Sequence, residues 1–242
     1  RGLRGRVEDG KSGGGNSYGY RVVRNTGPDG ELIRGDREID PTEAKIVRRI
    51  FIDYAAGKSP RVIAHELNAE GIAGPRASGW GPSTIHGNVK RGNGILNNEL
   101  YIGRLVWNRQ RFLKDPETGK RVARANPQEE WITQDVPELR ILDDELWAEV
   151  KARQGAIRKR YVSDESNGLT ATRRKRYLFS GLIKCAECGG GYSLVYRDSF
   201  GCSTVKNKGT CGNRTRIGRE ELESRVLSAL RENLMTPDLF KE

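Results

Sequence analysis

The chain has 242 residues, of which 35% are hydrophobic and 31% charged, and its mean hydropathy is −0.71. Its hydrophobic cores must therefore be small, and much of the chain must lie at a surface. No apolar run is long enough to span a membrane, and no segment has the pattern of a secretory signal peptide. The formal net charge of +11 makes nucleic acid the first class of partner to consider.

Residues 1–16 contain basic side chains among many glycines and almost no core-forming residues. Such a composition predicts an extended or flexible arm. A short strand is expected at 20–23, a turn at 27–30 and a return strand at 31–33, because short β-forming stretches flank a Gly-Pro-Asp-Gly sequence.

Asp40 marks the start of the first predicted helix. It is a suitable N-cap, Pro41 fits the first helical position, and Glu43 stands where a capping box needs it. Gly57 ends this helix. The apolar residues that follow helical spacing, and should face the core, are Ala44, Val47, Ile50, Phe51 and Tyr54.

Two more helices are predicted directly afterwards. The second runs from Ser59 to a stop at Gly71, and the third from about residue 82 to 91. Helix, turn, helix, connection and helix is the layout of a helix-turn-helix module, although many small helical bundles share it. The residues of the second helix expected to face inward are Val62, Ile63 and Leu67.

The next part of the chain predicts short strands. They are expected at 101–108, 121–124 and 130–132, with a hairpin turn at 115–120. Asp143 then caps a helix whose apolar face holds Leu146, Trp147 and Val150.

The rest of the chain begins with a polar and basic stretch. Residues 156–176 are predicted to be a linker, because they contain few apolar residues and many basic ones. A strand is expected at 192–196. A last helix at about 219–234 has apolar residues at i, i+4 spacing, which is typical of the start of a longer helical arm.

All four cysteines lie close together in the sequence. Cys185 and Cys188 have the spacing of a metal knuckle, and the three glycines after them suit its tight turn. A longer hairpin must bring Cys202 and Cys211 together. The pattern favours one structural Zn²⁺ held by four thiolates. Two disulfides or four free thiols are the alternatives, and a thioredoxin-like site is less favoured because no βαβ pattern surrounds the CxxC.

Residue types that support catalysis are sparse. His65 is expected to be an ordinary helix residue, and His86 fits a DNA contact better than a general base. The sequence contains no GxxxxGK[ST] loop and no GxGxxG after a strand. No catalytic residue is therefore predicted, and the sequence indicates binding.

Charges of opposite sign are sorted along the chain. Residues 76–124 hold ten Lys and Arg against three Asp and Glu, residues 151–184 hold ten against two, and residues 125–150 hold one against eight. Such stripes favour a track along phosphates, with clustered solvated faces as the alternative. The candidate DNA contacts are Arg1, Arg4, Arg6, Ser83, Thr84, His86, Asn88, Lys90, Arg91, Arg109, Arg111, Arg173, Arg174, Lys175, Arg176, Arg214 and Arg216.

These candidates have different expected roles. The arginines of the N-terminal arm suit a minor-groove insert, with a disordered tail as the alternative. The third helix offers the base-reading side chains, among which Asn88 suits adenine and Arg91 suits guanine. Ser83 or Thr84 can instead cap that helix.

Several short motifs occur in an order that is specific as a set. They include Tyr18-Gly19-Tyr20, Ile63-Ala64-His65-Glu66-Leu67-Asn68, Ser83-Thr84-Ile85, Tyr101-Ile102-Gly103, and the run from Leu178 through Cys188-Gly189-Gly190 to Cys211-Gly212-Asn213. This order resembles the large serine recombinases, in their recombinase domain and the zinc β-ribbon domain that follows it. The resemblance covers nearly the whole chain.

The resemblance implies an α+β fold. Residues 1–16 would be an interdomain arm, 17–155 a mixed helical and β recombinase domain of helix-turn-helix type, 156–176 a basic linker, and 177–242 a four-cysteine zinc β-ribbon with the start of a helical arm.

It also implies a function. The chain would bind double-stranded DNA at attachment half-sites, in a cytoplasmic, DNA-associated protein that a bacterium, a phage or a mobile element encodes. The family's serine nucleophile lies in an N-terminal domain that would precede Arg1, joined by a helix ending at about Arg1–Glu8, and the parent would act as a dimer or tetramer. The alternatives are a zinc-ribbon RNA-binding or translation-associated protein, and a thiol redox protein.

Overall fold

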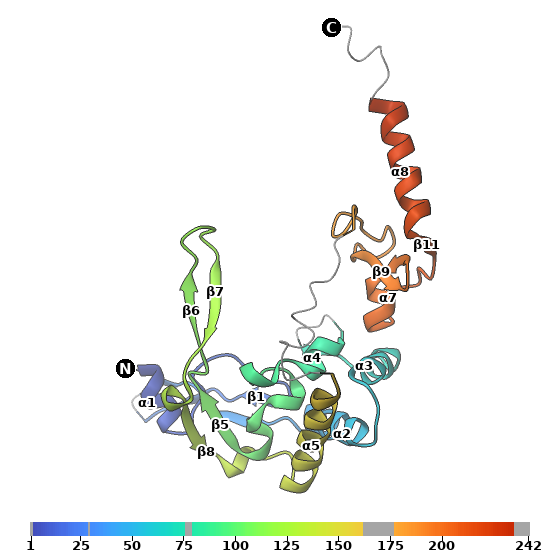
Figure 1. Cartoon of the computed structure of the whole chain (residues 1–242). Coiled ribbons are helices and arrows are strands. Elements are labelled where there is room, and N and C mark those ends of the chain that lie inside the picture. Colours follow the sequence, from blue (N-terminus) through green and yellow to red (C-terminus); the bar gives the residue numbers. More distant parts are fainter. Residues whose placement is uncertain (1, 29, 76–78, 162–176, 235–242) are drawn as a thin grey trace. The chain divides into compact units, whose positions relative to one another are not determined.

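The computed structural model of the chain describes residues 2–28, 30–75, 79–161 and 177–234 (Figure 1). The chain forms two compact units, Arg1–Ile63 with Pro82–Tyr161, and Ala64–Gly81 with Val162–Glu242. Helices occur together with small antiparallel sheets, which confirms the predicted α+β class. In the described ranges, no helix combines the length and the hydropathy that a membrane span requires.

The N-terminal segment contains a helix, so the extended arm predicted from composition is wrong for this part, whereas the helix that the resemblance implied, ending at about Glu8, is present. α1 (Gly2–Glu8) buries Val7 completely, and it packs against β8 (Ile132–Asp135). A Cβ built on Gly13 would meet the Trp107 ring at 2.6 Å and Val7 at 2.9 Å. Tertiary packing through Val7 therefore stabilises a helix that its glycine content disfavours.

Two small ribbons follow α1. β1 (Tyr20–Val22) pairs with β4 (Arg37–Ile39), and β2 (Asn25–Thr26) pairs with β3 (Leu32–Ile33). In the first ribbon Arg21 lies opposite Glu38, and the two side chains form an ion pair at 2.6 Å. The return strand predicted at 31–33 exists as β3, but it pairs with β2. The strand predicted at 20–23 is β1, and it pairs with β4 instead of with the return strand.

α2 (Pro41–Ala55) confirms the predicted cap and stripe. The Asp40 carboxylate accepts hydrogen bonds from the amides of Thr42 and Glu43, and the five residues of the predicted stripe are all buried. The capping box does not form, because the Glu43 carboxylate accepts the Gly19 amide at 2.7 Å instead. The cap therefore serves α2, while Glu43 anchors the preceding loop.

α3 (Pro60–Ala69) and α4 (Pro82–His86) follow α2. Ile63 and Leu67 are buried as predicted, whereas Val62 is 45% exposed, which corrects that part of the stripe. The third predicted helix is shorter than expected, since α4 ends at His86 and a separate 3₁₀ turn, η2 (Val89–Arg91), follows Gly87.

The remaining elements of the first unit are short turns, strands and one long helix. β5 pairs with β8, and β6 pairs with β7, each as a separate antiparallel ribbon. The bounds are η3 (Ile95–Asn97), η4 (Glu99–Ile102), β5 (Arg104–Trp107), β6 (Gln110–Lys114), β7 (Arg121–Ala125), η5 (Gln128–Glu130), η6 (Pro137–Leu139) and α5 (Asp144–Tyr161).

α5 closes the first unit against α2. Asp143 caps it by accepting the Leu146 amide at 2.8 Å, as predicted. The guanidinium of Arg153 donates to the carbonyl of Tyr54, to that of Gly57 at 2.6 Å and to that of Lys58 at 3.0 Å, so it satisfies the C-terminus of α2. Since α5 continues to Tyr161, the predicted linker is helical at 156–161, and its residues 162–176 lie outside the described ranges.

Four aromatic side chains form the centre of the first unit. The rings of Tyr20 and Tyr101 stack with centroids 5.9 Å apart, and Phe51 meets Tyr101 edge-on at 6.1 Å. Phe51 also stacks on Trp147 at 5.7 Å. The buried Tyr20 hydroxyl lies 2.8 Å from the carbonyl oxygen of Leu139, so its polar end is satisfied. These contacts tie β1, α2, η4 and α5 to one core.

The second unit contains the cysteines. Its three-stranded antiparallel sheet has the order β11-β10-β9, and one helix precedes β11 in sequence while another follows it. Phe200 on its central strand is fully buried. The bounds are β9 (Tyr192–Tyr196), β10 (Ser199–Cys202), α7 (Ser203–Lys208), β11 (Arg216–Gly218) and α8 (Arg219–Leu234). The predicted last helix agrees with α8.

Candidate metal centre and nucleic-acid interface

The four cysteine side chains converge on one point in the second unit. Their sulfur atoms all lie within 4.8 Å of one another. The Sγ atoms of Cys185 and Cys211 are 3.9 Å apart, and those of Cys188 and Cys202 are 3.5 Å apart. Four sulfurs at about 2.3 Å from one metal ion in a tetrahedron lie about 3.8 Å from each other. The spacing therefore fits a tetrahedral Zn²⁺, and all four thiols are unbridged.

Local backbone geometry aims the first two sulfurs. The Gly189 amide donates to the Cys185 carbonyl at 2.8 Å, and the Cys185 amide donates to the Gly190 carbonyl at 2.7 Å. Gly189 has φ of +67°, a conformation that favours glycine. A Cβ on Gly190 would overlap the Thr204 hydroxyl, so the knuckle also packs closely on α7.

Asn213 supports the cluster from outside. Its side-chain amide donates to the Cys185 Sγ at 3.3 Å, and its backbone amide donates to the Cys211 Sγ at 3.4 Å. Donors aimed at sulfur stabilise thiolate ligands in the manner of outer-shell groups around metals.

The thiols do not ionise independently in the absence of a cation. Hydrogen bonds from the knuckle amides, first that of Cys188, lower the pKa of Cys185 to about 6. At Cys211 the Asn213 amide acts in the same direction, but burial and the neighbouring thiols raise the pKa to about 12. Four thiolates this close repel one another, and a divalent cation would relieve that repulsion. The donor set and its electrostatics both fit zinc.

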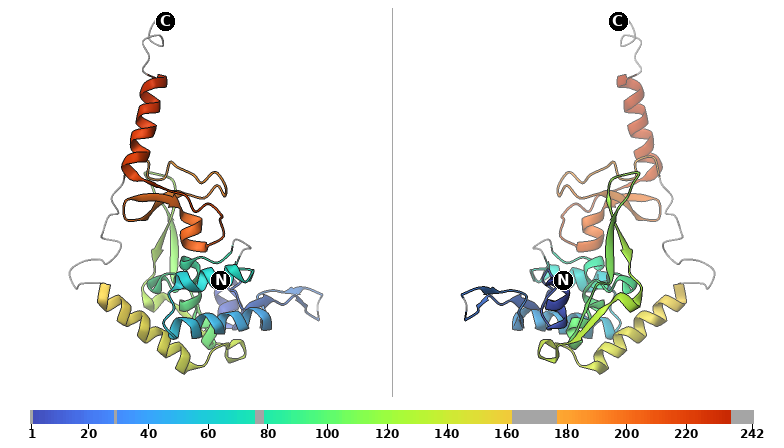
Figure 2. Two further views of the ribbon diagram at one scale, coloured as in Figure 1. Left: turned by 90° about the vertical axis from the view of Figure 1, so that its right-hand side faces the viewer. Right: turned by 90° about the vertical axis from the view of Figure 1, so that its left-hand side faces the viewer.

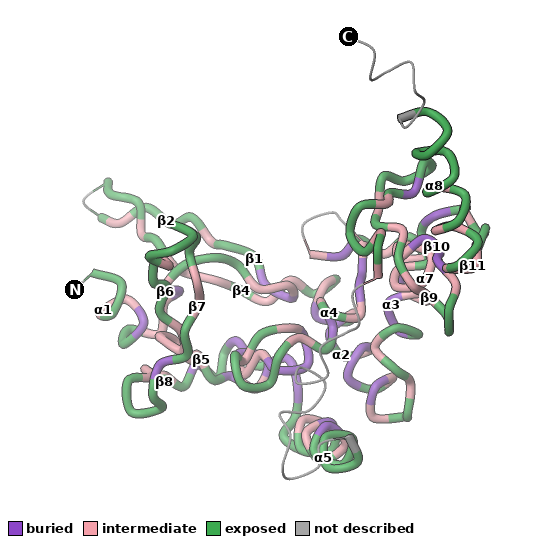
Figure 3. The backbone as a smooth tube through the Cα atoms, turned by 45° about the horizontal axis from the view of Figure 1, so that its top comes forward, coloured by how far each residue is buried: buried purple, intermediate pink, exposed green. Residues whose placement is uncertain are grey.

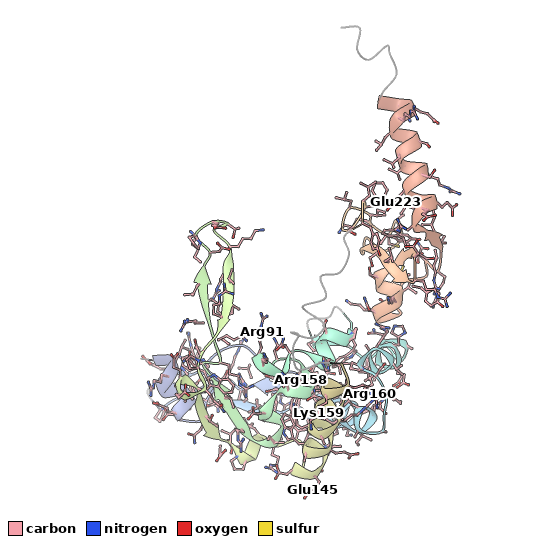
Figure 4. All side chains as sticks on the ribbon, viewed as in Figure 1. Arg91, Glu145, Arg158, Lys159, Arg160 and Glu223 are labelled. Carbon is pink, nitrogen blue, oxygen red and sulfur yellow. The ribbon has the colours of Figure 1, made fainter. Side chains whose placement is uncertain are left out.

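The segment after α4 forms a closed turn in the first unit. We call residues 87–94 the reading turn. Asn88 and Asn93 form an isolated antiparallel bridge, and the Asn88 side chain accepts the Arg91 amide at 3.1 Å. Asn88 is therefore occupied in capping η2. Lys90 and Arg91 are exposed (Figure 4 labels Arg91), so they are the cationic side chains that the turn presents.

A buried polar network holds the reading turn from below. The Asn97 side-chain amide donates to the carbonyls of His86 at 2.7 Å and Asn93 at 2.9 Å. Lys151 Nζ on α5 donates to Asn97 Oδ1 at 2.9 Å and to Gln154 Oε1 at 3.0 Å. Burial lowers the pKa of Lys151 to about 8, while the Glu99 carboxylate acts in the opposite direction and the Arg109 charge adds to the lowering. The position of the turn is thus fixed by residues distant in sequence.

Arg109 has a structural environment. Its guanidinium lies 2.5 Å from the Glu99 carboxylate and 5.0 Å from the centre of the Trp131 ring, and its side chain is only 12% exposed. A Cβ on Gly92 would overlap it. Arg109 therefore packs beneath the reading turn, a position that leaves little of it to contact phosphate.

The other candidates fall into three groups. In the first unit, Arg4 is exposed and pairs with Glu8 at 2.9 Å, and Arg6 is half-buried. In the second unit, Arg214 and Arg216 are exposed. Other exposed or half-buried candidates of the first unit are Ser83, Thr84, His86 and Arg111. The candidates that lie outside the described ranges are Arg1, Arg173, Arg174, Lys175 and Arg176.

Comparison with known protein families gives two matches in chain order. Residues 41–155 match the recombinase family model, and residues 178–231 match the recombinase zinc β-ribbon domain. Together these matches cover more than half of the chain, in the order that the resemblance to the large serine recombinases predicts. The chain carries a recombinase domain followed by a recombinase zinc β-ribbon domain.

A curated relative of this chain has low sequence identity to it. A protein of Bacillus subtilis (strain 168) described as "Putative DNA recombinase" is 28% identical over 193 residues. The match covers 76% of this chain and 34% of the relative, so the chain spans about a third of that protein's length.

Two solved structures are similar to this recombinase chain at 18% identity. "Crystal Structure of a LSR-DNA Complex" has a TM-score of 0.38 and covers 96% of this chain and 64% of the other. "Sequence Requirements of the Listeria innocua prophage attP site" has a TM-score of 0.34, with 91% and 79% covered.

Two features of the candidate site were not predicted from the sequence. Arg158, Lys159 and Arg160 form a basic last turn of α5 (Figure 4), although the sequence placed them in a linker. The supporting role of Lys151 was also missed, because its partner Asn97 is more than fifty residues away. The dense basic residues after residue 150 were a signal for the first feature, and none was present for the second.

Proposed function

We propose that this chain binds double-stranded DNA at recombination half-sites, as the DNA-binding portion of a site-specific serine recombinase. The observation that carries the proposal is the order of the two family matches, a recombinase domain followed by its zinc β-ribbon. Strand cutting is proposed for the whole recombinase, since the B. subtilis relative is much longer than this chain.

One structural Zn²⁺ is proposed at Cys185, Cys188, Cys202 and Cys211. The sulfur spacing, the Asn213 donors and the zinc-ribbon match support it. Because four thiolates fill a tetrahedron, this ion would have no open position for substrate and would stabilise the fold of the second unit.

The reading turn is proposed to contact base edges. Lys90 and Arg91 are exposed, and the bridge between Asn88 and Asn93 together with the Asn97 bonds holds their backbone in place. A fixed arginine can pair bidentately with guanine, which discriminates against other bases by about 1–3 kcal/mol. Asn88, which caps η2, is proposed as a positioning residue of the turn.

The basic end of α5 is proposed to contact phosphates. Arg158, Lys159 and Arg160 are exposed in its last turn (Figure 4). We also propose the domain bounds 17–155 and 177–242, a DNA-associated location, and a parent that assembles as a dimer or tetramer on DNA.

Binding to DNA and RNA of one sequence tests the proposal. The zinc-loaded chain is titrated onto labelled DNA duplexes and onto matched RNA duplexes at equal salt concentration. The proposal expects tighter binding to DNA and an affinity that falls steeply with salt, by about 0.9 logarithmic units per phosphate contact for each tenfold increase. Tighter binding to the RNA duplex would favour the zinc-ribbon RNA-binding alternative.

A further inference from the structure

The β6–β7 ribbon is an uncovered two-stranded sheet. It contains only these two strands, and it extends away from the other elements of its unit (Figures 1 and 2). Its residues are exposed or half-buried throughout (Figure 3), and Phe112 and Leu113 are 54% and 49% exposed. Two-stranded sheets without a covering layer are marginally stable in water. An exposed ribbon of this kind calls for a partner that adds stability.

The turn of the ribbon is well defined. The Asp115 carboxylate accepts the amides of Glu117 at 3.0 Å and Thr118 at 3.4 Å, and these bonds lower its pKa. The Asp115 and Gly119 backbones are also hydrogen-bonded across the turn. Asp115 is therefore engaged within the turn, where the Arg124 charge also helps to lower its pKa.

Like charges face each other across the two strands. Arg111 lies directly opposite Arg124, and Lys114 lies directly opposite Arg121. Within the described ranges, none of these four cations has an acidic partner within ion-pair distance. Directly opposed like charges destabilise an antiparallel pair. The β1–β4 ribbon of the same unit shows the opposite arrangement, with Arg21 facing Glu38.

The two like-charged pairs lie on opposite faces. Adjacent residues of a strand point to opposite faces, so the Lys114–Arg121 pair shares one face with Phe112, and the Arg111–Arg124 pair shares the other with Leu113. The Arg121 guanidinium stacks on the Phe112 ring at 4.1 Å. A ribbon that is cationic on both faces is complementary to a groove with anionic groups on both sides.

We propose that the β6–β7 ribbon enters the major groove of duplex DNA, where its two faces meet the phosphates of the two strands. The major groove is about 12 Å wide and admits a two-stranded ribbon. Phosphates neutralise the facing cations, so DNA supplies the stability that the free ribbon lacks. This inference rests on the proposed DNA binding and adds a second contact, distinct from the reading turn.

The charge-reversed variant Arg124→Glu separates this role from a structural one. It places an acid opposite Arg111, as Glu38 lies opposite Arg21, so amide hydrogen exchange at 110–125 should slow in the free protein. Affinity for a random-sequence duplex pool should fall roughly tenfold, because a phosphate contact is lost. If Arg124 had only a structural role, its replacement would change the hydrogen-exchange protection of the ribbon and the affinity for DNA in the same direction.

The double variant Arg111→Gln/Arg124→Gln measures the contacts, with Arg21→Gln as the matched control on the other ribbon. The slope of log affinity against log salt should become shallower by about 1.8 in the double variant and stay unchanged in the control. An unchanged slope in the double variant, or wild-type affinity in Arg124→Glu, overturns the inference and leaves the proposed DNA binding standing. A wild-type chain that binds no duplex overturns both.

Discussion

The reading turn depends on a glycine at position 87. Gly87 has φ of +57°, and a Cβ built there would overlap the Asn93 carbonyl. That carbonyl accepts the Asn88 amide at 3.1 Å and the Asn97 side chain at 2.9 Å. Gly87→Ala should therefore displace Asn93 and lose both hydrogen bonds, in addition to the cost of a left-handed alanine.

Gly15→Ala is the matched control for this change. Gly15 has φ of +69° in the same unit, and its Cβ would meet nothing within 4 Å. It should lose about 1 kcal/mol of unfolding free energy, since a left-handed residue costs roughly 1–2 kcal/mol and a stiffer unfolded chain returns about 0.4–1 kcal/mol. Gly87→Ala adds two lost hydrogen bonds of about 1 kcal/mol each, which gives about 3 kcal/mol in total.

Denaturant unfolding and DNA competition together check this prediction. Gly87→Ala should lower the affinity for a preferred duplex about tenfold or more, because displaced Lys90 and Arg91 lose base contacts worth about 1–3 kcal/mol each. Gly15→Ala should keep wild-type affinity. If the two variants lose equal stability and both retain affinity, the reading turn is not held by the contacts described here.

Three further predictions concern the zinc centre and α5. Cys188→Ser should reduce bound zinc below one ion per chain and raise hydrogen exchange at 177–234 but not in the first unit; unchanged zinc content would contradict the four-thiolate site. Arg153→Met should cost about 2–4 kcal/mol in denaturant unfolding, since it leaves three carbonyls at the end of α2 without a charged donor, and Arg153→Lys should cost less. Lys151 has a pKa of about 8 in the folded protein against an ordinary 10.5, so the unfolded chain binds more protons between these values. The free energy of unfolding of the wild type should therefore rise between pH 8 and 10.5 relative to that of Lys151→Met. If the unfolding free energies of the two proteins change with pH in parallel, the pKa of Lys151 is not lowered.

Local signals in the sequence predict the parts of the fold that depend on neighbours along the chain. The stripe of α2 follows from helical spacing, and its Asp40 cap and the Asp143 cap of α5 follow from side chains beside the amides that they accept. The approach of Cys185 and Cys188 to each other could be predicted for the same reason, because their spacing is that of a metal knuckle.

The remaining features depend on contacts between distant residues. α1 forms because Val7 is buried, which its glycine-rich surroundings do not indicate. β1 pairs with β4 and not with the nearer strand, so turn signals alone gave the wrong partner. Asn88 has a side chain suited to adenine, yet its neighbour Arg91 supplies an amide that it accepts locally. The opposed Arg111 and Arg124 become visible only when the register of the ribbon is known.

Selection of duplexes from a random-sequence pool tests whether the chain binds a specific DNA sequence. The zinc-loaded chain is incubated with the pool at fixed salt, and the retained duplexes are sequenced over successive rounds. Duplex DNA should be retained and one shared motif enriched, and Gly87→Ala should weaken that enrichment. Failure to retain any duplex, even in dilute buffer, would contradict the proposed DNA binding.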